Sequence, residues 1–163
     1  METTLNKSLQ VITTVELLKH WQDHRALTRR TIDAFPEKAF FNHTIGGMRP
    51  FSEMVMELLA IAAPGLKEIA SGITAQFNEN IEHGNQKAKI LELWDNATEE
   101  INTYWSQIKE EQFQQTIKLF GQYEGTVWSS IFYFIDNEIH HRGQGYVYLR
   151  SLGIEPPAFY ERN

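Results

Sequence analysis

Residues 126–153 read TVWSSIFYFIDNEIHHRGQGYVYLRSLG, and this stretch decides the fold class of the chain. Its apolar side chains recur every three or four residues, the spacing that places them on one side of an α-helix. Thr126 is a suitable N-cap, and Gly153 with two prolines shortly beyond it is typical of a helix end. We therefore predict a helix that begins after Gly125 and ends at Leu152. Its apolar stripe, which Arg142 interrupts, consists of Trp128, Ile131, Ile135, Ile139, Tyr146 and Leu149.

A second amphipathic segment lies near the start of the chain, from about Thr14 to Phe35. Thr13 with Glu16 three residues later is typical of a capping box, which satisfies free N–H groups at the start of a helix. Pro36 cannot continue the helix and ends it. Residues 37–49 contain two glycines and no clear period, so we expect a loop there. The stripe of this helix consists of Val15, Leu18, Trp21, Arg25, Thr28, Ile32 and Phe35.

Two further helical segments occupy the middle of the chain. One begins near Pro50, which suits a first helical turn, and ends at Ser71–Gly72. Pro64–Gly65 should kink or break it, because proline lacks the N–H of a helical hydrogen bond. Residues 73–86 are ambiguous and could form a loop with one helical turn. The other segment keeps its apolar period over residues 87–112.

The last connection, residues 113–124, is rich in glutamine, lysine and tyrosine and forms either a short hairpin or a simple crossover. Four long helices without an internal repeat predict an all-α, up-down-up-down four-helix bundle. We expect a single domain over residues 1–163. Long connections join the first helix to the second and the third to the fourth, and such connections can shape the mouth of a site.

Composition narrows the function classes. The chain has 163 residues, with 15 Lys and Arg against 21 Asp and Glu, so its formal net charge is -6. This balance argues against general nucleic-acid binding, which needs a basic face. No apolar run of ~18 residues is present, as a membrane span would require, and Met1–Leu9 lacks the pattern of a secretory signal. The absence of cysteine excludes disulfides and thiolate metal sites. We expect a cytoplasmic protein.

A polar and aromatic stripe runs beside the apolar one on the last helix. Asn137 and His141 within it are four residues apart, a spacing at which two side chains can bind one ion. The alternative interpretation is a half-buried row of hydrogen-bonded side chains without a ligand. The stripe consists of Tyr133, Asn137, His141, Gln144 and Tyr148.

Two charged residues stand out inside apolar runs. Glu57 is the only charge in residues 54–63, and a buried carboxylate requires an ion partner, a proton or a metal. It either points to solvent or points inward, where it could meet Asn137 and His141 across the bundle axis. Arg142 interrupts an apolar stripe, and we expect it to be structural and buried with carboxylate or carbonyl partners.

Several short motifs resemble those of the DinB-like, or YfiT-like, family of helical bundles. The resemblance covers nearly the whole chain, and its most specific element is His-Arg-Gly-Gln on the last helix. The matching segments are His20–Arg25, Phe35–Glu37, Arg49–Met54, Asn137–Gln144, Tyr148–Gly153 and Pro156–Tyr160.

This resemblance implies a metal site. Members of the family typically hold a divalent ion, zinc or nickel, with one histidine from the second helix and two from the last. The matching positions here are Glu57, Asn137 and His141, of which only the third keeps histidine. Tyr133, Gln144 and Tyr148 would then be pocket residues around the ligands, a role that the motif itself does not fix.

Two functions follow from the resemblance. The first is a metal-dependent transferase or hydrolase, in which the ion activates a small-molecule thiol or water for attack on an electrophile. The second is a catalytically degenerate bundle that binds a small ligand or forms a dimer. The resemblance also implies a homodimer, because bundles of this family often pair through their faces.

Overall fold

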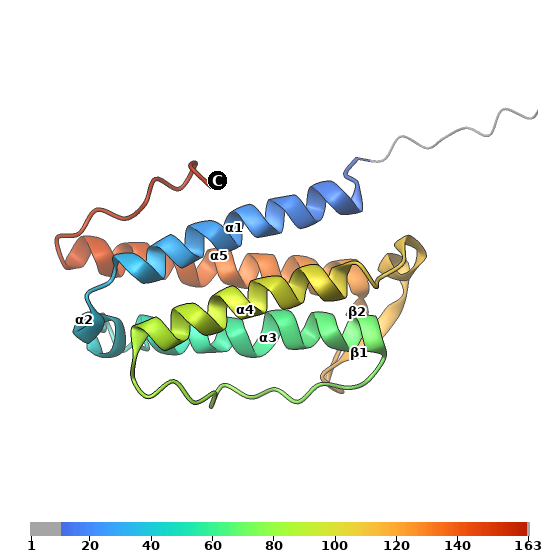
Figure 1. Cartoon of the computed structure of the whole chain (residues 1–163), viewed down its shortest axis with the longest axis horizontal. Coiled ribbons are helices and arrows are strands. Elements are labelled where there is room, and N and C mark those ends of the chain that lie inside the picture. Colours follow the sequence, from blue (N-terminus) through green and yellow to red (C-terminus); the bar gives the residue numbers. More distant parts are fainter. Residues whose placement is uncertain (1–10, 163) are drawn as a thin grey trace, which may run out of the picture.

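Four long helices lie side by side and form the body of the protein, as the computed structural model of residues 11–162 shows (Figure 1). The long helices are α1 (Thr14–Ala34), α3 (Phe51–Ser71), α4 (Lys87–Trp105) and α5 (Val127–Ser151). The mostly helical fold is therefore confirmed. Met1–Leu9, where we expect no secretory signal, lies outside the described residues. Within residues 11–162, no helix combines the length and the apolarity needed to cross a membrane.

The order of helix directions differs from the predicted up-down-up-down arrangement. Figure 1 shows that α1 and α5 run one way while α3 and α4 run the other way. The reason is residues 72–86, which return along the bundle from the end of α3 to the start of α4. An extended chain advances ~3.3 Å per residue, against ~1.5 Å in a helix, so this segment can pass the 19 residues of α4. Helical periodicity carries no information on such a return.

The two predicted long connections are present and contain structure of their own. Residues 37–49, predicted as a loop, include the short helix α2 (Glu37–Asn42), whose Phe40 is fully buried against Phe35 and Phe51. A helix of six residues is too short to show a period in the sequence.

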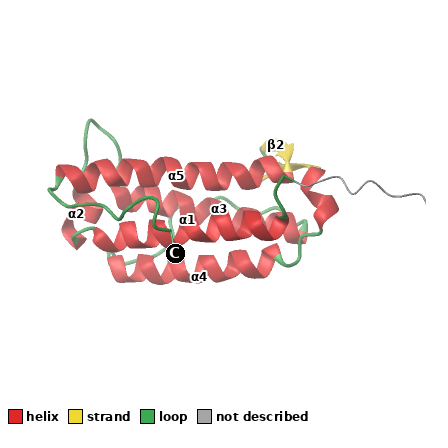
Figure 2. Cartoon of the chain, turned by 90° about the horizontal axis from the view of Figure 1, so that it is seen from above, coloured by secondary structure: helices red, strands yellow, loops and turns green. Residues whose placement is uncertain are grey.

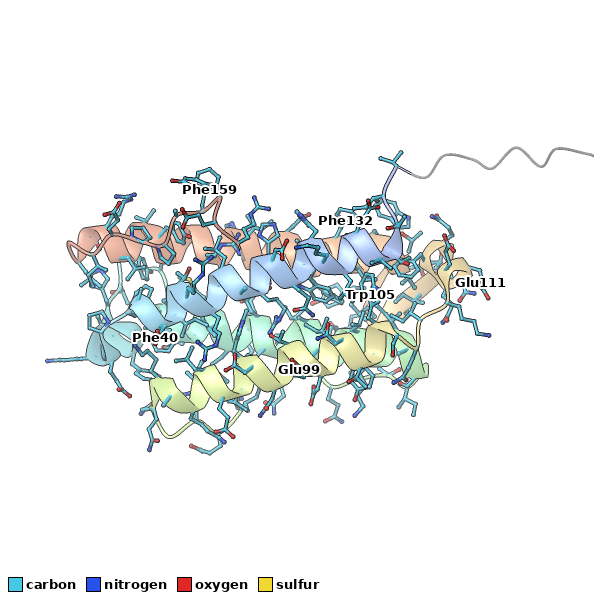
Figure 3. All side chains as sticks on the ribbon, turned by 45° about the horizontal axis from the view of Figure 1, so that its top comes forward. Phe40, Glu99, Trp105, Glu111, Phe132 and Phe159 are labelled. Carbon is cyan, nitrogen blue, oxygen red and sulfur yellow. The ribbon has the colours of Figure 1, made fainter. Side chains whose placement is uncertain are left out.

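The second connection begins earlier than predicted, because α4 ends at Trp105 and not at residue 112. Just beyond that end, the hydroxyl of Ser106 donates to the carbonyl of Thr103, a local bond that competes with the helical pattern. A 3-10 helix, η1 (Glu110–Gln114), follows, and its Phe113 packs on Trp105. Figure 3 shows Trp105 between the long helices.

Residues 113–124 contain the hairpin that was one of the two predicted alternatives. Strand β1 (Thr116–Leu119) pairs antiparallel with β2 (Tyr123–Thr126), at the end of the bundle where α5 begins (Figure 2). The buried carboxylate of Glu68 in α3 accepts a hydrogen bond from the N–H of Phe120 at 3.0 Å, in the turn of the hairpin. A second bond to the N–H of Ala75 fastens the 72–86 segment to the same helix. Glu68 therefore fixes two surfaces that border the site described below.

Helix α3 is continuous through Pro64, where we predicted a kink or a break. Both sides of the proline are packed: Ala60, Ala63 and Leu66 are all buried. We infer that this packing outweighs the hydrogen bond that proline removes, a loss of ~3 kcal/mol.

Two glycines fix how α3 and α5 pass each other. A Cβ on Gly65 would lie 2.6 Å from the ring of Phe134, and one on Gly145 would lie 2.6 Å from the ring of Phe51. Both rings are almost fully buried, and the close packing around them leaves no space into which they could move. The two helices are therefore antiparallel in a fixed register, in which Glu57, in the first half of α3, faces the middle of α5.

A charged network lies inside the bundle between α1, α4 and α5. Glu138 is 1% exposed and accepts a bond from the hydroxyl of Thr28 at 2.6 Å. Arg25 and Arg142 lie 3.6 and 3.8 Å from the two oxygens of Glu138. Burial raises the pKa of the Glu138 carboxyl, and the two guanidinium groups oppose that rise. Arg142 also donates to Nδ1 of His24 at 2.8 Å.

Arg142→Ala should therefore lower the free energy of unfolding by about 3–5 kcal/mol, because it leaves Glu138 with one cation fewer in a buried site. Chemical denaturation monitored by circular dichroism measures the change. Arg150→Ala, at the exposed end of the same helix, is the matched control and should cost less than about 1 kcal/mol. An unchanged midpoint for Arg142→Ala would show that its role is not structural.

Candidate functional site

Glu57 points into the bundle and meets the polar stripe of α5. Its side chain is 18% exposed. One carboxylate oxygen, Oε1, accepts a hydrogen bond from the amide of Asn137 at 3.2 Å and lies 3.2 Å from Nε2 of His141. Of the two orientations that the sequence left open, the inward one is present. The three residues in the family's ligand positions thus come together between α3 and α5.

Arg49, in the segment before α3, supplies the positive charge at this cluster. Its guanidinium donates to Oε2 of Glu57 in a short, charge-assisted hydrogen bond. Its second terminal nitrogen lies 4.0 Å from the carboxylate of Glu79. The backbone of Arg49 is held as well, because the hydroxyl of the buried Tyr148 donates to its carbonyl at 2.8 Å.

These contacts decide the ionisation of Glu57. Burial alone would raise the pKa of the carboxyl. The hydrogen bonds from Arg49, Asn137 and His141 outweigh burial and hold this pKa below its usual value of 4.5. Glu57 is therefore ionised at neutral pH and can only accept hydrogen bonds.

The imidazole of His141 is oriented from both sides. Nε2 faces Oε1 of Glu57 at 3.2 Å. On the other side, Nδ1 lies 2.7 Å from the side-chain oxygen of Gln144, and the amide nitrogen of Gln144 contacts the sulfur of Met48 at 3.5 Å. Because the amide oxygen of Gln144 can only accept, Nδ1 is the donor in the shorter contact, and the ring is held between Gln144 and Glu57.

A pocket of about 510 Å³ opens beside Glu57, between α3, α5, the hairpin and the 72–86 segment. Its walls are mostly apolar and aromatic, and Tyr133 stands on its α5 side. Burial and the nearby charge of Glu57 raise the pKa of the Tyr133 phenol. The residues that line the pocket are Glu57, Ile61, Phe77, Glu79, Leu119, Phe120, Tyr123, Glu124, Gly125, Ser129, Ser130, Tyr133 and Phe134.

The other residues predicted from the sequence to surround the ligands make different contacts. Tyr133 lines the pocket, Gln144 orients His141, and Tyr148 acts on the backbone of Arg49. Arg142 faces α1, where it donates to His24 and Thr28, and takes no part in the cluster.

Sequence reasoning missed Arg49. It was quoted only as part of the motif at the start of the second helix, and nothing in a helical period connects a residue of the preceding loop with Glu57 eight positions later. The available signal was charge balance, because an inward carboxylate requires a cation or several donors nearby.

The arrangement fits a zinc or nickel ion poorly. Such ions take neutral imidazoles and carboxylates whose lone pairs converge on one point. Here Asn137 turns its NH₂ toward Glu57, and Arg49 already pairs with the carboxylate that an ion would need. Within residues 11–162, no three or more His, Asp and Glu side chains are grouped so that they could hold a metal ion.

The fold and the site together define a class, a helical bundle with a polar cluster and a pocket between α3 and α5. The chain matches the DinB family over residues 1–163 and belongs to that family. A comparison with curated proteins found no match.

Two solved structures show the same fold. A crystal structure of a DinB-like protein from Bacillus cereus ATCC 10987 aligns with a TM-score of 0.74 and 14% identity, over 90% of this chain and 97% of that one. The DinB-like protein YjoA of Bacillus subtilis aligns with a TM-score of 0.72 and 22% identity, over 90% of this chain and 99% of that one. Identities this low support the fold and carry no information on activity.

Removing the cation should raise the pKa of the Glu57 carboxyl. In Arg49→Met, burial still disfavours the carboxylate, while the hydrogen bond that most strongly lowers its pKa is gone. We expect the Glu57 carboxyl to titrate below 4.5 in the wild-type protein and clearly higher in the variant. Carbon-detected NMR of labelled glutamates measures both values. Equal values in the two proteins would show that Arg49 does not control the charge of Glu57.

Proposed function

We propose that this DinB-family protein binds a small organic molecule in the pocket beside Glu57, and that it does so without a resident metal ion. Glu57, the member of the polar cluster that lines the pocket, would contact the ligand at one end. The apolar walls would hold the rest of it. A pocket of about 510 Å³ has the size and the mostly apolar lining of small-molecule sites.

The observation that carries this proposal is the ion pair between Arg49 and Glu57. A divalent ion bound to Glu57 would lie close to a guanidinium that is always charged, and the two cations would repel each other. Binding the ion would first require Arg49 to leave Glu57 and the NH₂ of Asn137 to turn away from it. Both steps oppose metal binding. A ligand that binds through hydrogen bonds requires neither of them.

The second candidate is the metal-dependent transferase or hydrolase implied by the family resemblance, with a small-molecule thiol or water as the nucleophile. One observation favours it: the three side chains in the ligand positions do meet. The metal, the reaction and the substrate stay predictions.

The homodimer also stays a prediction. Trp128 and Phe132 on α5 are more than a third exposed, and they lie beside the start of α1 near Val11 and Ile12. Figure 3 shows Phe132 on the outside of the bundle.

Calorimetric titration with zinc and nickel separates the two candidates. We expect no measurable binding by the wild-type protein. The double variant Glu57→His with Asn137→His supplies the histidines of the family pattern, and adding Arg49→Met removes the repelling cation. The triple variant should bind more than about a hundredfold tighter than the wild type, since even changes around the ligands of a metal site are worth ten- to a hundredfold.

The single variant Arg49→Met is the control, because it removes the cation without adding donors. Tight binding of either metal by the wild-type protein would overturn the proposal and favour the metal-dependent enzyme. If the folded triple variant binds neither metal, the three positions lack the geometry of ligands, and the metal-dependent candidate loses its only structural support.

A further inference from the structure

Apart from the hydroxyls of Tyr123 and Tyr133, the polar side chains that line the pocket offer a ligand acceptors and no donors. Three of them are the carboxylates of Glu57, Glu79 and Glu124. Two others, the hydroxyls of Ser129 and Ser130, already donate to the carbonyl of Thr126 at 2.8 and 3.1 Å. Because each hydroxyl has one proton, these two serines have only lone pairs left for a ligand.

The charged side chains that line the pocket are all negative. No Lys or Arg is among its lining residues, whereas three carboxylates are. Arg49 contacts Glu57 and Glu79 but does not line the pocket, so its single charge leaves the group of carboxylates net negative. The raised pKa of the Tyr133 phenol has the same cause in part, because the charge of Glu57 disfavours a second anion there.

Aromatic side chains make up much of the remaining wall. Phe77 and Phe120 stand edge to face with ring centroids 6.2 Å apart, and Tyr123, Tyr133 and Phe134 complete the lining. Aromatic faces attract cations through the negative charge above the ring plane. They also pack well against a flat apolar body.

We propose that the ligand of this pocket is an organic cation, an ammonium or amidinium group on an aromatic or aliphatic body. The inference rests on the proposed small-molecule function and adds the charge of the ligand to it. The cationic group would donate to the carboxylates and the two serine oxygens, and the body would lie between the aromatic rings. An anionic ligand of the same shape would face three carboxylates and find few donors.

Three probes with one aromatic body test this proposal: tryptamine, which is a cation at neutral pH, tryptophol, which is neutral, and indoleacetate, which is an anion. Calorimetric titration at low ionic strength should give the tightest binding for tryptamine. We expect it to exceed tryptophol by about tenfold, the effect of more than one partly exposed ion pair. Indoleacetate should bind more weakly than either.

Variants assign the binding to this pocket. Glu124→Gln should weaken tryptamine about threefold and leave tryptophol unchanged, as the loss of one exposed ion pair predicts. Glu99→Gln is the matched control, because it makes the same charge change on the outer surface of α4 (Figure 3). Ile61→Trp fills the pocket and should abolish binding of all probes. Ser130→Trp does the same from α5 if the first variant does not fold.

The outcomes separate this inference from the function on which it rests. If the three probes bind equally and the filling variants abolish binding, the charge preference is wrong and the pocket function stands. The same holds if indoleacetate binds best. If no probe binds, or if binding survives in folded filling variants, both the charge preference and the pocket function are contradicted.

Discussion

A carboxylate between two packed helices must be compensated, and Glu57 meets that requirement with Arg49 of the same chain. The rest of the site depends on this ion pair. It keeps Glu57 ionised, so that Asn137 must turn its NH₂ toward the carboxylate, which His141 also contacts. It also ties the segment before α3 to the first half of that helix, and Tyr148 of α5 holds the same segment by donating to the carbonyl of Arg49. The consequence is a cluster that is electrically complete without a metal ion.

The position of the cluster follows from packing on both faces of α5. Toward α3, the contacts of Gly145 with Phe51 and of Gly65 with Phe134 set the register. Toward α1 and α4, the register depends on the buried charges around Glu138. One helix thus carries a structural set of charges on one face and a functional set on the other. Neighbouring residues such as Glu138 and Asn137 belong to different sets because successive residues of a helix are turned by about 100°.

The sequence predicted what is local and missed what depends on distant partners. The Thr13 capping box, the N-cap at Thr126 and the left-handed glycine at Gly153 all occur as predicted, since each needs only a few adjacent residues. Trp128 and Ile139, assigned to the apolar stripe of α5, are more than a third exposed. The predicted order of helix directions was wrong because residues 72–86 run back along the bundle between α3 and α4. The helical periodicity of the sequence does not indicate the path of such a connection. The pairing of Arg49 with Glu57 could not be predicted without knowing the path of the loop that carries Arg49.

The central claim is that the cluster around Glu57 is complete without a metal ion. Its most direct test is the metal content of the protein, purified without a histidine tag and without chelators and measured by elemental mass spectrometry. The ion pair with Arg49 predicts zinc and nickel far below one equivalent per chain. One equivalent of either metal, retained through dialysis, would contradict the claim and show that the ion displaces Arg49 from Glu57.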